Sequence, residues 1–129
     1  WVMRALRNPL ANAHNHGAAG DGVDHWWSQR FSAILLVPLV LWLVWALSVL
    51  AGADYEAATT WLASPWNAAM SILFVLASFY HGRLGLQIVI GDYIHHRATE
   101  VTLQVAVAAA AIFGALIAVV SILSVAFSG

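Results

Sequence analysis

The stretch that decides the fold is Phe31–Ala51, FSAILLVPLVLWLVWALSVLA, which contains no charged residue over 21 positions. A helix that crosses the hydrocarbon core of a bilayer needs about 20 predominantly apolar residues. Backbone groups in lipid must be paired within their own segment, and this requirement selects a helix. The stretch therefore predicts a membrane-spanning helix, and Pro38 inside it predicts a bend.

Two further apolar runs follow the same pattern. One extends from Trp66 to Ile90 and is interrupted by His81 and Arg83, and the other, Val101–Phe127, is uncharged over 27 residues. Neither shows the alternation of polar and apolar residues that is typical of outer-membrane strands. The sequence therefore predicts an all-α fold with three transmembrane helices that form part of a heteromeric helical bundle.

The expected boundaries are those of a single membrane-anchor domain, residues 25–129, preceded by a polar arm, residues 1–24. The arm is glycine-rich and is expected to be irregular and interfacial. Ser64 and Pro65 are expected to begin the second helix, with Ser64 as the cap. The helices are expected at about 28–51, 65–92 and 99–127.

Composition narrows the class of protein further. The chain of 129 residues is 62% hydrophobic and 9% charged, whereas a soluble domain carries about a quarter charged residues. Membrane lipid is therefore its expected surroundings. A net charge of −1 gives no electrostatic basis for binding nucleic acid. The absence of cysteine excludes iron–sulfur ligation and covalently attached haem by this chain.

The positions of the arginines predict the orientation. Arg4, Arg7 and Arg30 precede the first helix, and Arg97 lies in the loop after the second, whereas residues 52–63 contain no positive charge. Positively charged loops remain on the cytoplasmic side of a membrane. The N-terminus is therefore expected in the cytoplasm and the C-terminus in the periplasm or its equivalent.

His81 is the histidine that lies well inside an apolar run. An ionisable group at that depth is costly and is usually functional, and a neutral imidazole can be an axial ligand of haem iron. Gly85, one turn away, would let a flat macrocycle approach the backbone. A histidine that is hydrogen-bonded between packed helices is an equally good interpretation of the position alone.

Asp92 and Tyr93 lie at the cytoplasmic end of the second helix. A tyrosine hydroxyl there can donate to a quinone carbonyl, and a neighbouring carboxylate can orient it. From the residues alone, an interfacial tyrosine beside a solvated aspartate is the favoured interpretation. Arg30 is either a cytoplasmic anchor or a partner for an anionic group such as a haem propionate. The remaining histidines are expected to be exposed polar residues: His14, His16, His25, His95 and His96.

The string formed by His81, Gly85, Asp92 and Tyr93 resembles the second-helix signature of the smaller hydrophobic anchor subunits of succinate dehydrogenase, respiratory complex II. Gln87 fits the same pattern. Gly22-Val23, followed by Arg30 and Ser32, is similar to that family's entry into its first helix. The resemblance covers roughly residues 22–129.

This resemblance implies a membrane anchor of a succinate:quinone oxidoreductase in a bacterial cytoplasmic membrane. His81 would be an axial ligand of haem b near Arg30, Tyr93 would bind ubiquinone with support from Asp92, and the haem would be shared with the larger cytochrome b anchor subunit. The other implied partners are the iron–sulfur and flavoprotein subunits, without which the chain would not oxidise succinate. Two alternatives stay open: a haem-free structural anchor of a related fumarate reductase-type complex, and a small transporter.

Overall fold

The computed structural model describes residues 19–128, and within that range the chain folds entirely into helices and short connections. The helices are α3 (Ala19–Leu50), α4 (Tyr55–Ala63), α5 (Pro65–Tyr93) and α6 (Arg97–Phe127). Three segments are long and apolar enough to cross a membrane: Val23–Leu50, Pro65–Tyr93 and Arg97–Phe127. The prediction of an all-α protein with three membrane-length helices is therefore confirmed.

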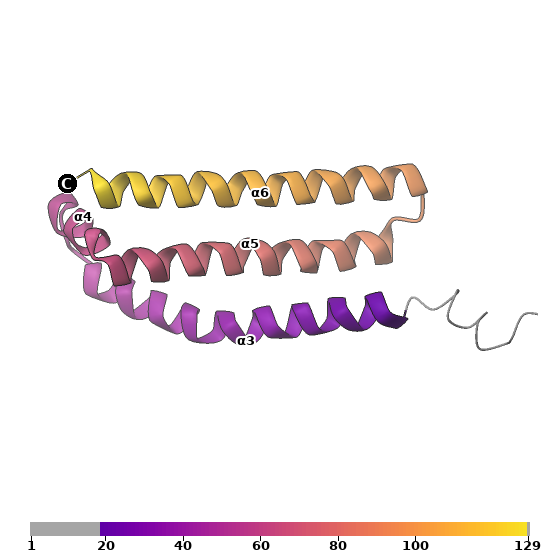
Figure 1. The fold of residues 1–129 in the computed structure, drawn as a ribbon, viewed down its shortest axis with the longest axis horizontal. Coiled ribbons are helices and arrows are strands. Elements are labelled where there is room, and N and C mark those ends of the chain that lie inside the picture. Colours follow the sequence, from indigo (N-terminus) through magenta and orange to yellow (C-terminus); the bar gives the residue numbers. More distant parts are fainter. Residues whose placement is uncertain (1–18, 129) are drawn as a thin grey trace, which may run out of the picture.

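The three long helices lie side by side, with α5 in the middle (Figure 1). Helix α5 packs against α6 on one side and α3 on the other, and successive long helices run in opposite directions. This packing buries few side chains; the buried apolar residues of the described range are Leu39, Ala46, Ala77, Leu84 and Ile90. Most of the apolar surface consequently faces outward, where lipid or other membrane subunits can cover it.

Helix α3 begins earlier than the sequence indicates. Residues 19–24, which the sequence assigns to an irregular arm, are helical. Extending an existing helix gains one hydrogen bond for each residue fixed, and no proline precedes Pro38 in the helix to stop the extension. The rest of the arm lies outside the described residues. Helix α3 bows along its length, as the internal proline predicts (Figure 1).

Helix α4 occupies a segment that the sequence indicates to be a loop. Gly52 has a φ of +81°, which lets the chain turn after α3. The Asp54 side chain then caps α4 by accepting from Ala57 N at 2.8 Å. The Trp61 ring stacks on Trp42 of α3, with ring centroids 5.8 Å apart. This stacking attaches the short helix to the end of the membrane bundle.

The start of α5 agrees with the sequence in position but differs in detail. Ser64 occupies the N-cap position and Pro65 the first turn, as expected, but the Ser64 side chain makes no capping hydrogen bond. The backbone N–H of Ser64 donates to Trp61 O at 3.3 Å, and Asn67 Nδ2 donates to the same oxygen at 2.9 Å. Backbone and amide contacts therefore organise the junction between α4 and α5.

Close approach of α5 and α6 depends on Gly114. A Cβ atom at this position would lie 2.6 Å from Phe79 Cε1 and 2.9 Å from Phe79 Cζ. Carbon atoms pack at about 3.5–4.0 Å, so the phenyl ring occupies space that any other residue would need. Small residues at helix interfaces are a common device for close packing in membranes.

Candidate functional site

The contact between Ser32 of α3 and His81 of α5 lies at the centre of the candidate site. Ser32 Oγ is 2.9 Å from His81 Nδ1, and the same hydroxyl donates to Gln29 O at 3.0 Å. Ser32 is 3% exposed and is the one buried polar residue among the side chains that the structure describes. The histidine is therefore hydrogen-bonded between packed helices, as one of the two sequence interpretations expects, and the bond uses one ring nitrogen.

His81 lines two neighbouring cavities beside α3. The larger, of about 550 Å³, also includes His25, Trp26, Gln29, Arg30, Ala33 and Ile88 in its walls. The smaller, of about 340 Å³, is apolar apart from His81 and is lined by Ala33, Leu36, Val37, Val40 and Leu41. The imidazole thus lies where a polar cavity meets an apolar one, and a flat amphipathic ligand has the same two kinds of surface.

Arg30 and His25 contribute the basic character of the larger cavity. Arg30 is exposed, and its guanidinium carbon lies 5.4 Å from the centroid of the Trp26 ring. His25 is half-buried within α3, so the expectation that it is an exposed polar residue is corrected. Sequence reasoning missed His25, although its spacing of seven residues from Ser32 places both on one face of a helix.

Two observations bear on whether these residues fit a haem group. Among the described residues, no group of three or more histidine, aspartate or glutamate side chains could hold a bare metal ion. The donor set around His81 is instead one imidazole beside an arginine, which suits a group that carries both a metal and carboxylates. A Cβ at Gly85 would lie 3.9 Å from Nε2 of Gln29, a residue in the wall of the larger cavity, and the close approach of a macrocycle at Gly85 stays a prediction.

Asp92 and Tyr93 lie at the end of α5, apart from His81. Both are exposed, Tyr93 with 77% of its surface accessible. Eleven and twelve residues of helix separate them from His81, which corresponds to about 16–18 Å along the axis. The structure therefore does not bring the two groups of candidate residues into one site, and no hydrogen bond between described residues fixes the orientation of the Tyr93 hydroxyl.

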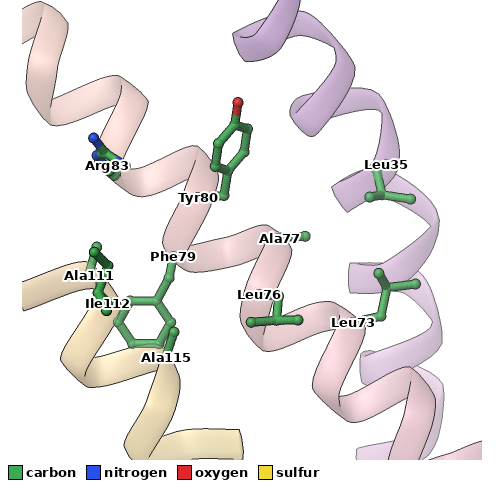
Figure 2. Close-up of a pocket in the computed structure, with 10 residues that line it drawn as sticks. All are labelled: Leu35, Leu73, Leu76, Ala77, Phe79, Tyr80, Arg83, Ala111, Ile112 and Ala115. Carbon is green, nitrogen blue, oxygen red and sulfur yellow. The ribbon is translucent and has the colours of Figure 1, made fainter. Parts of the chain in front are cut away.

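Arg83 lies on the opposite side of α5 from His81. It lines a cavity of about 440 Å³ that is walled by apolar residues of α3, α5 and α6 (Figure 2). Its Nε atom is buried and has no hydrogen-bond partner in the described range. A separation of two residues in an α-helix rotates a side chain by about 200° about the helix axis. His81 and Arg83 therefore line different cavities although they are close in sequence.

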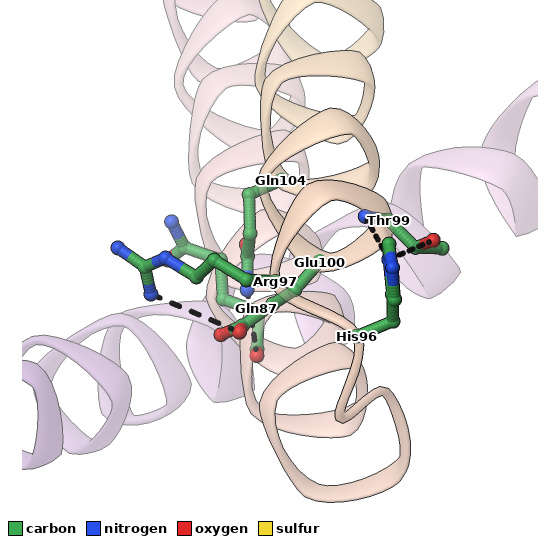
Figure 3. A network of polar contacts seen from close by, with 6 residues as sticks. All are labelled: Gln87, His96, Arg97, Thr99, Glu100 and Gln104. Carbon is green, nitrogen blue, oxygen red and sulfur yellow. Dashed lines mark hydrogen bonds and ion pairs between the residues drawn. The ribbon is translucent and has the colours of Figure 1, made fainter.

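Polar residues at the start of α6 have structural roles (Figure 3). The His96 side chain caps the helix by accepting from Thr99 N at 3.4 Å. The exposed Arg97 forms an ion pair of 3.9 Å with the half-buried Glu100, and one turn deeper Gln104 Nε2 donates to Gln87 O at 3.2 Å. These contacts fix the turn between α5 and α6, and none of these residues lines a cavity that contains His81.

Three membrane-length helices, with a histidine held between two of them, define an integral membrane protein of the helical anchor type. Residues 4–123 match the family described as succinate dehydrogenase/fumarate reductase transmembrane subunit. The chain belongs to this family.

Individual relatives agree with the family assignment. The chain is 36% identical to the succinate dehydrogenase hydrophobic membrane anchor subunit of Rickettsia bellii, over 79% of this chain and 82% of the relative. It is 31% identical to the succinate dehydrogenase membrane anchor subunit of Reclinomonas americana, over 63% and 70% of the two chains. The corresponding subunit of Paracoccus denitrificans is 28% identical over 66% of each chain.

Proposed function

We propose that this chain is the smaller membrane-anchor subunit of a succinate:quinone oxidoreductase. It docks the flavoprotein and iron–sulfur subunits to the membrane, binds haem b together with a larger cytochrome b anchor subunit, and forms part of the ubiquinone-reduction site. The relatives' names support the anchoring role. The observation that carries the haem proposal is the position of His81, whose Nδ1 is bonded to Ser32 beside a cavity containing Arg30.

In this proposal His81 is an axial ligand of the iron, and Arg30 neutralises a propionate. Bound haem supplies one-electron redox chemistry, and this chain supplies the ligand, the counter-charge and an apolar wall that excludes water. His25 lies about 10 Å from the level of Ser32 along α3, so it is better placed for a propionate than for the iron. The second axial ligand is a histidine of the larger anchor subunit.

The quinone proposal rests on Tyr93 and Asp92. Both are exposed at the end of α5, where an apolar helix meets a polar loop, and a quinone head group would lie at that boundary. The Tyr93 hydroxyl donates to a quinone carbonyl, and Asp92 supports it by orienting the hydroxyl or by exchanging protons. Their distance along the helix from His81 makes this a site separate from the haem ligand.

The proposed setting is a bacterial cytoplasmic membrane. The N-terminus and the turn between α5 and α6 lie on the cytoplasmic side, where the catalytic partners dock, and the C-terminus lies in the periplasm. The arginine asymmetry supports this orientation. The proposed single anchor domain, residues 25–129, begins within α3.

Replacing His81 with alanine in the assembled complex tests the haem proposal. The purified variant should lose or strongly perturb the absorption bands of haem b and should hold the larger anchor subunit less firmly, because haem bound to the pair stabilises the pair. His95→Ala, an exposed substitution in the turn before α6, is the matched control and should keep both properties. A native haem spectrum and a stable complex in His81→Ala would overturn the assignment.

A haem-free structural anchor is the second candidate, and one observation favours it. The hydrogen bond between His81 Nδ1 and Ser32 Oγ gives one ring nitrogen of the imidazole a partner. It also joins α3 to α5 without any bound ligand. The absorption spectrum of the unmodified complex separates this candidate from the first, since it predicts no haem bands. A transporter is less well supported, because His81 and Arg83 line different cavities and provide no shared path.

A further inference from the structure

Three atoms form a short chain of hydrogen bonds between α3 and α5. His81 Nδ1 contacts Ser32 Oγ at 2.9 Å, and Ser32 Oγ donates to Gln29 O at 3.0 Å. A serine hydroxyl has one hydrogen and two lone pairs. When that hydrogen is donated to Gln29 O, the hydroxyl accepts from His81; Nδ1 then carries the proton and Nε2 keeps its lone pair.

We propose that Ser32 is a positioning residue that fixes the tautomer and the rotation of the His81 ring, so that Nε2 is presented as the ligand atom. This inference rests on the proposed ligation of haem by His81. A neutral imidazole binds a metal through the lone pair of one ring nitrogen. The hydrogen bond made by the other nitrogen decides which of the two nitrogens is the ligand. Ser32 therefore acts on the iron through His81 and does not itself touch it.

The surroundings of Ser32 suit it to this role. Its side chain is 3% exposed, so no water competes for the hydroxyl. Ser32 lies in the continuous helix α3. The hydrogen bond from its hydroxyl to Gln29 O, within the same helix, holds the side-chain rotamer independently of His81. A ligand ring held by two packed helices needs little reorganisation when the metal group binds.

Ser48 provides a contrast within the same helix. The Ser48 hydroxyl donates to Trp45 O at 2.6 Å, just as the Ser32 hydroxyl donates to the carbonyl three positions earlier. Ser48, however, is exposed and has no hydrogen bond to a histidine. The local bond alone is therefore an ordinary feature of a serine in a helix. What distinguishes Ser32 is the second bond, to a residue 49 positions away in the sequence.

An acceptor on Nδ1–H also makes the imidazole a stronger electron donor. This effect favours the oxidised iron over the reduced iron. Removing the hydroxyl should therefore raise the midpoint potential of the haem. Loss of such a supporting hydrogen bond typically weakens metal binding by roughly 10- to 100-fold.

The test compares Ser32→Ala, Ser32→Thr and Ser48→Ala in the purified complex. Ser32→Ala should weaken haem retention by roughly 10- to 100-fold, alter the electron paramagnetic resonance signal of the ferric haem and raise the midpoint potential. Ser32→Thr, which keeps a hydroxyl, should recover these properties, and Ser48→Ala should match the unmodified complex. If Ser32→Ala retains haem with an unchanged signal and potential, the positioning role is wrong.

A measurement on the unmodified complex keeps the inference testable if Ser32→Ala does not assemble. Solid-state ¹⁵N nuclear magnetic resonance of histidine-labelled complex should show His81 with a protonated Nδ1 and an unprotonated Nε2. A proton on Nε2 would overturn the inference. Absence of haem from the unmodified complex would instead refute the proposed ligation itself, so failure of the two proposals can be distinguished.

Discussion

Replacing Gly114 with alanine should destabilise the contact between α5 and α6. The new Cβ would lie 2.6 Å from Phe79 Cε1, about an ångström closer than two carbon atoms pack. Overpacking of this kind costs about 1–3 kcal/mol. Phe79 is 37% exposed and its ring can move outward, so the cost of this clash should lie at the lower end of that range, at about 1 kcal/mol. A cost of this size by itself corresponds to roughly a fivefold change in the unfolding equilibrium.

Thermal unfolding of the purified complex in bicelles measures this cost, with Gly91→Ala as the matched control. A Cβ at Gly91 meets no described atom within 4 Å, so alanine there gains helix propensity without a clash, worth up to about 1 kcal/mol. Alanine at Gly114 gains the same helix propensity, which offsets part of the clash, so the Gly114 variant should unfold at a lower temperature than the Gly91→Ala control. A Gly114→Ala complex as stable as Gly91→Ala would refute the close-packing argument.

Two further predictions concern the quinone and the orientation. Tyr93→Phe should leave the fold and any haem intact but slow quinone reduction by about 2- to 10-fold, the effect of losing one hydrogen bond of about 0.5–1.5 kcal/mol. Tyr55→Phe, exposed at the other end of the bundle, should leave the quinone kinetics unchanged, and equal rates for both variants would reduce Tyr93 to an interfacial residue. A cysteine introduced by Ser128→Cys into this cysteine-free chain should react with an impermeant reagent added to the periplasmic side, whereas His95→Cys should not. The reverse labelling pattern would invert the proposed orientation.

The three membrane-length helices could be predicted because bilayer thickness imposes a minimum length of apolar sequence. Helix α4 could not, because nine residues give too short a pattern, and its start depends on the side-chain contact from Asp54 to Ala57 N. The extension of α3 to Ala19 was missed for a different reason. Polar and glycine-rich residues favour irregular structure by themselves, but they continue a helix at small cost once a membrane span has nucleated it.

His81 was recognisable in the sequence because an ionisable group inside an apolar run is rare. Ser32 was noted as part of the family resemblance, but its contact with His81 was not predicted, because the apolar runs indicate which segments are helices but not how each helix is rotated towards its neighbour. His25 was missed because the first helix was expected to begin at about residue 28, whereas within α3 it lines the same cavity as Arg30. Contacts between helices therefore remained beyond sequence reasoning, even where the helices themselves were clear.

The side-by-side arrangement of α3, α5 and α6 gives α5 two open flanks, one with His81 and the other with Arg83. His81 and Arg83 share no cavity, so substitutions on the two flanks that lie more than about 7–10 Å apart and touch no common residue should combine additively in their effects on stability. Each flank can therefore change in evolution without a compensating change on the other. Such a subunit can retain one neighbour while its opposite surface adapts to a different lipid or a different protein.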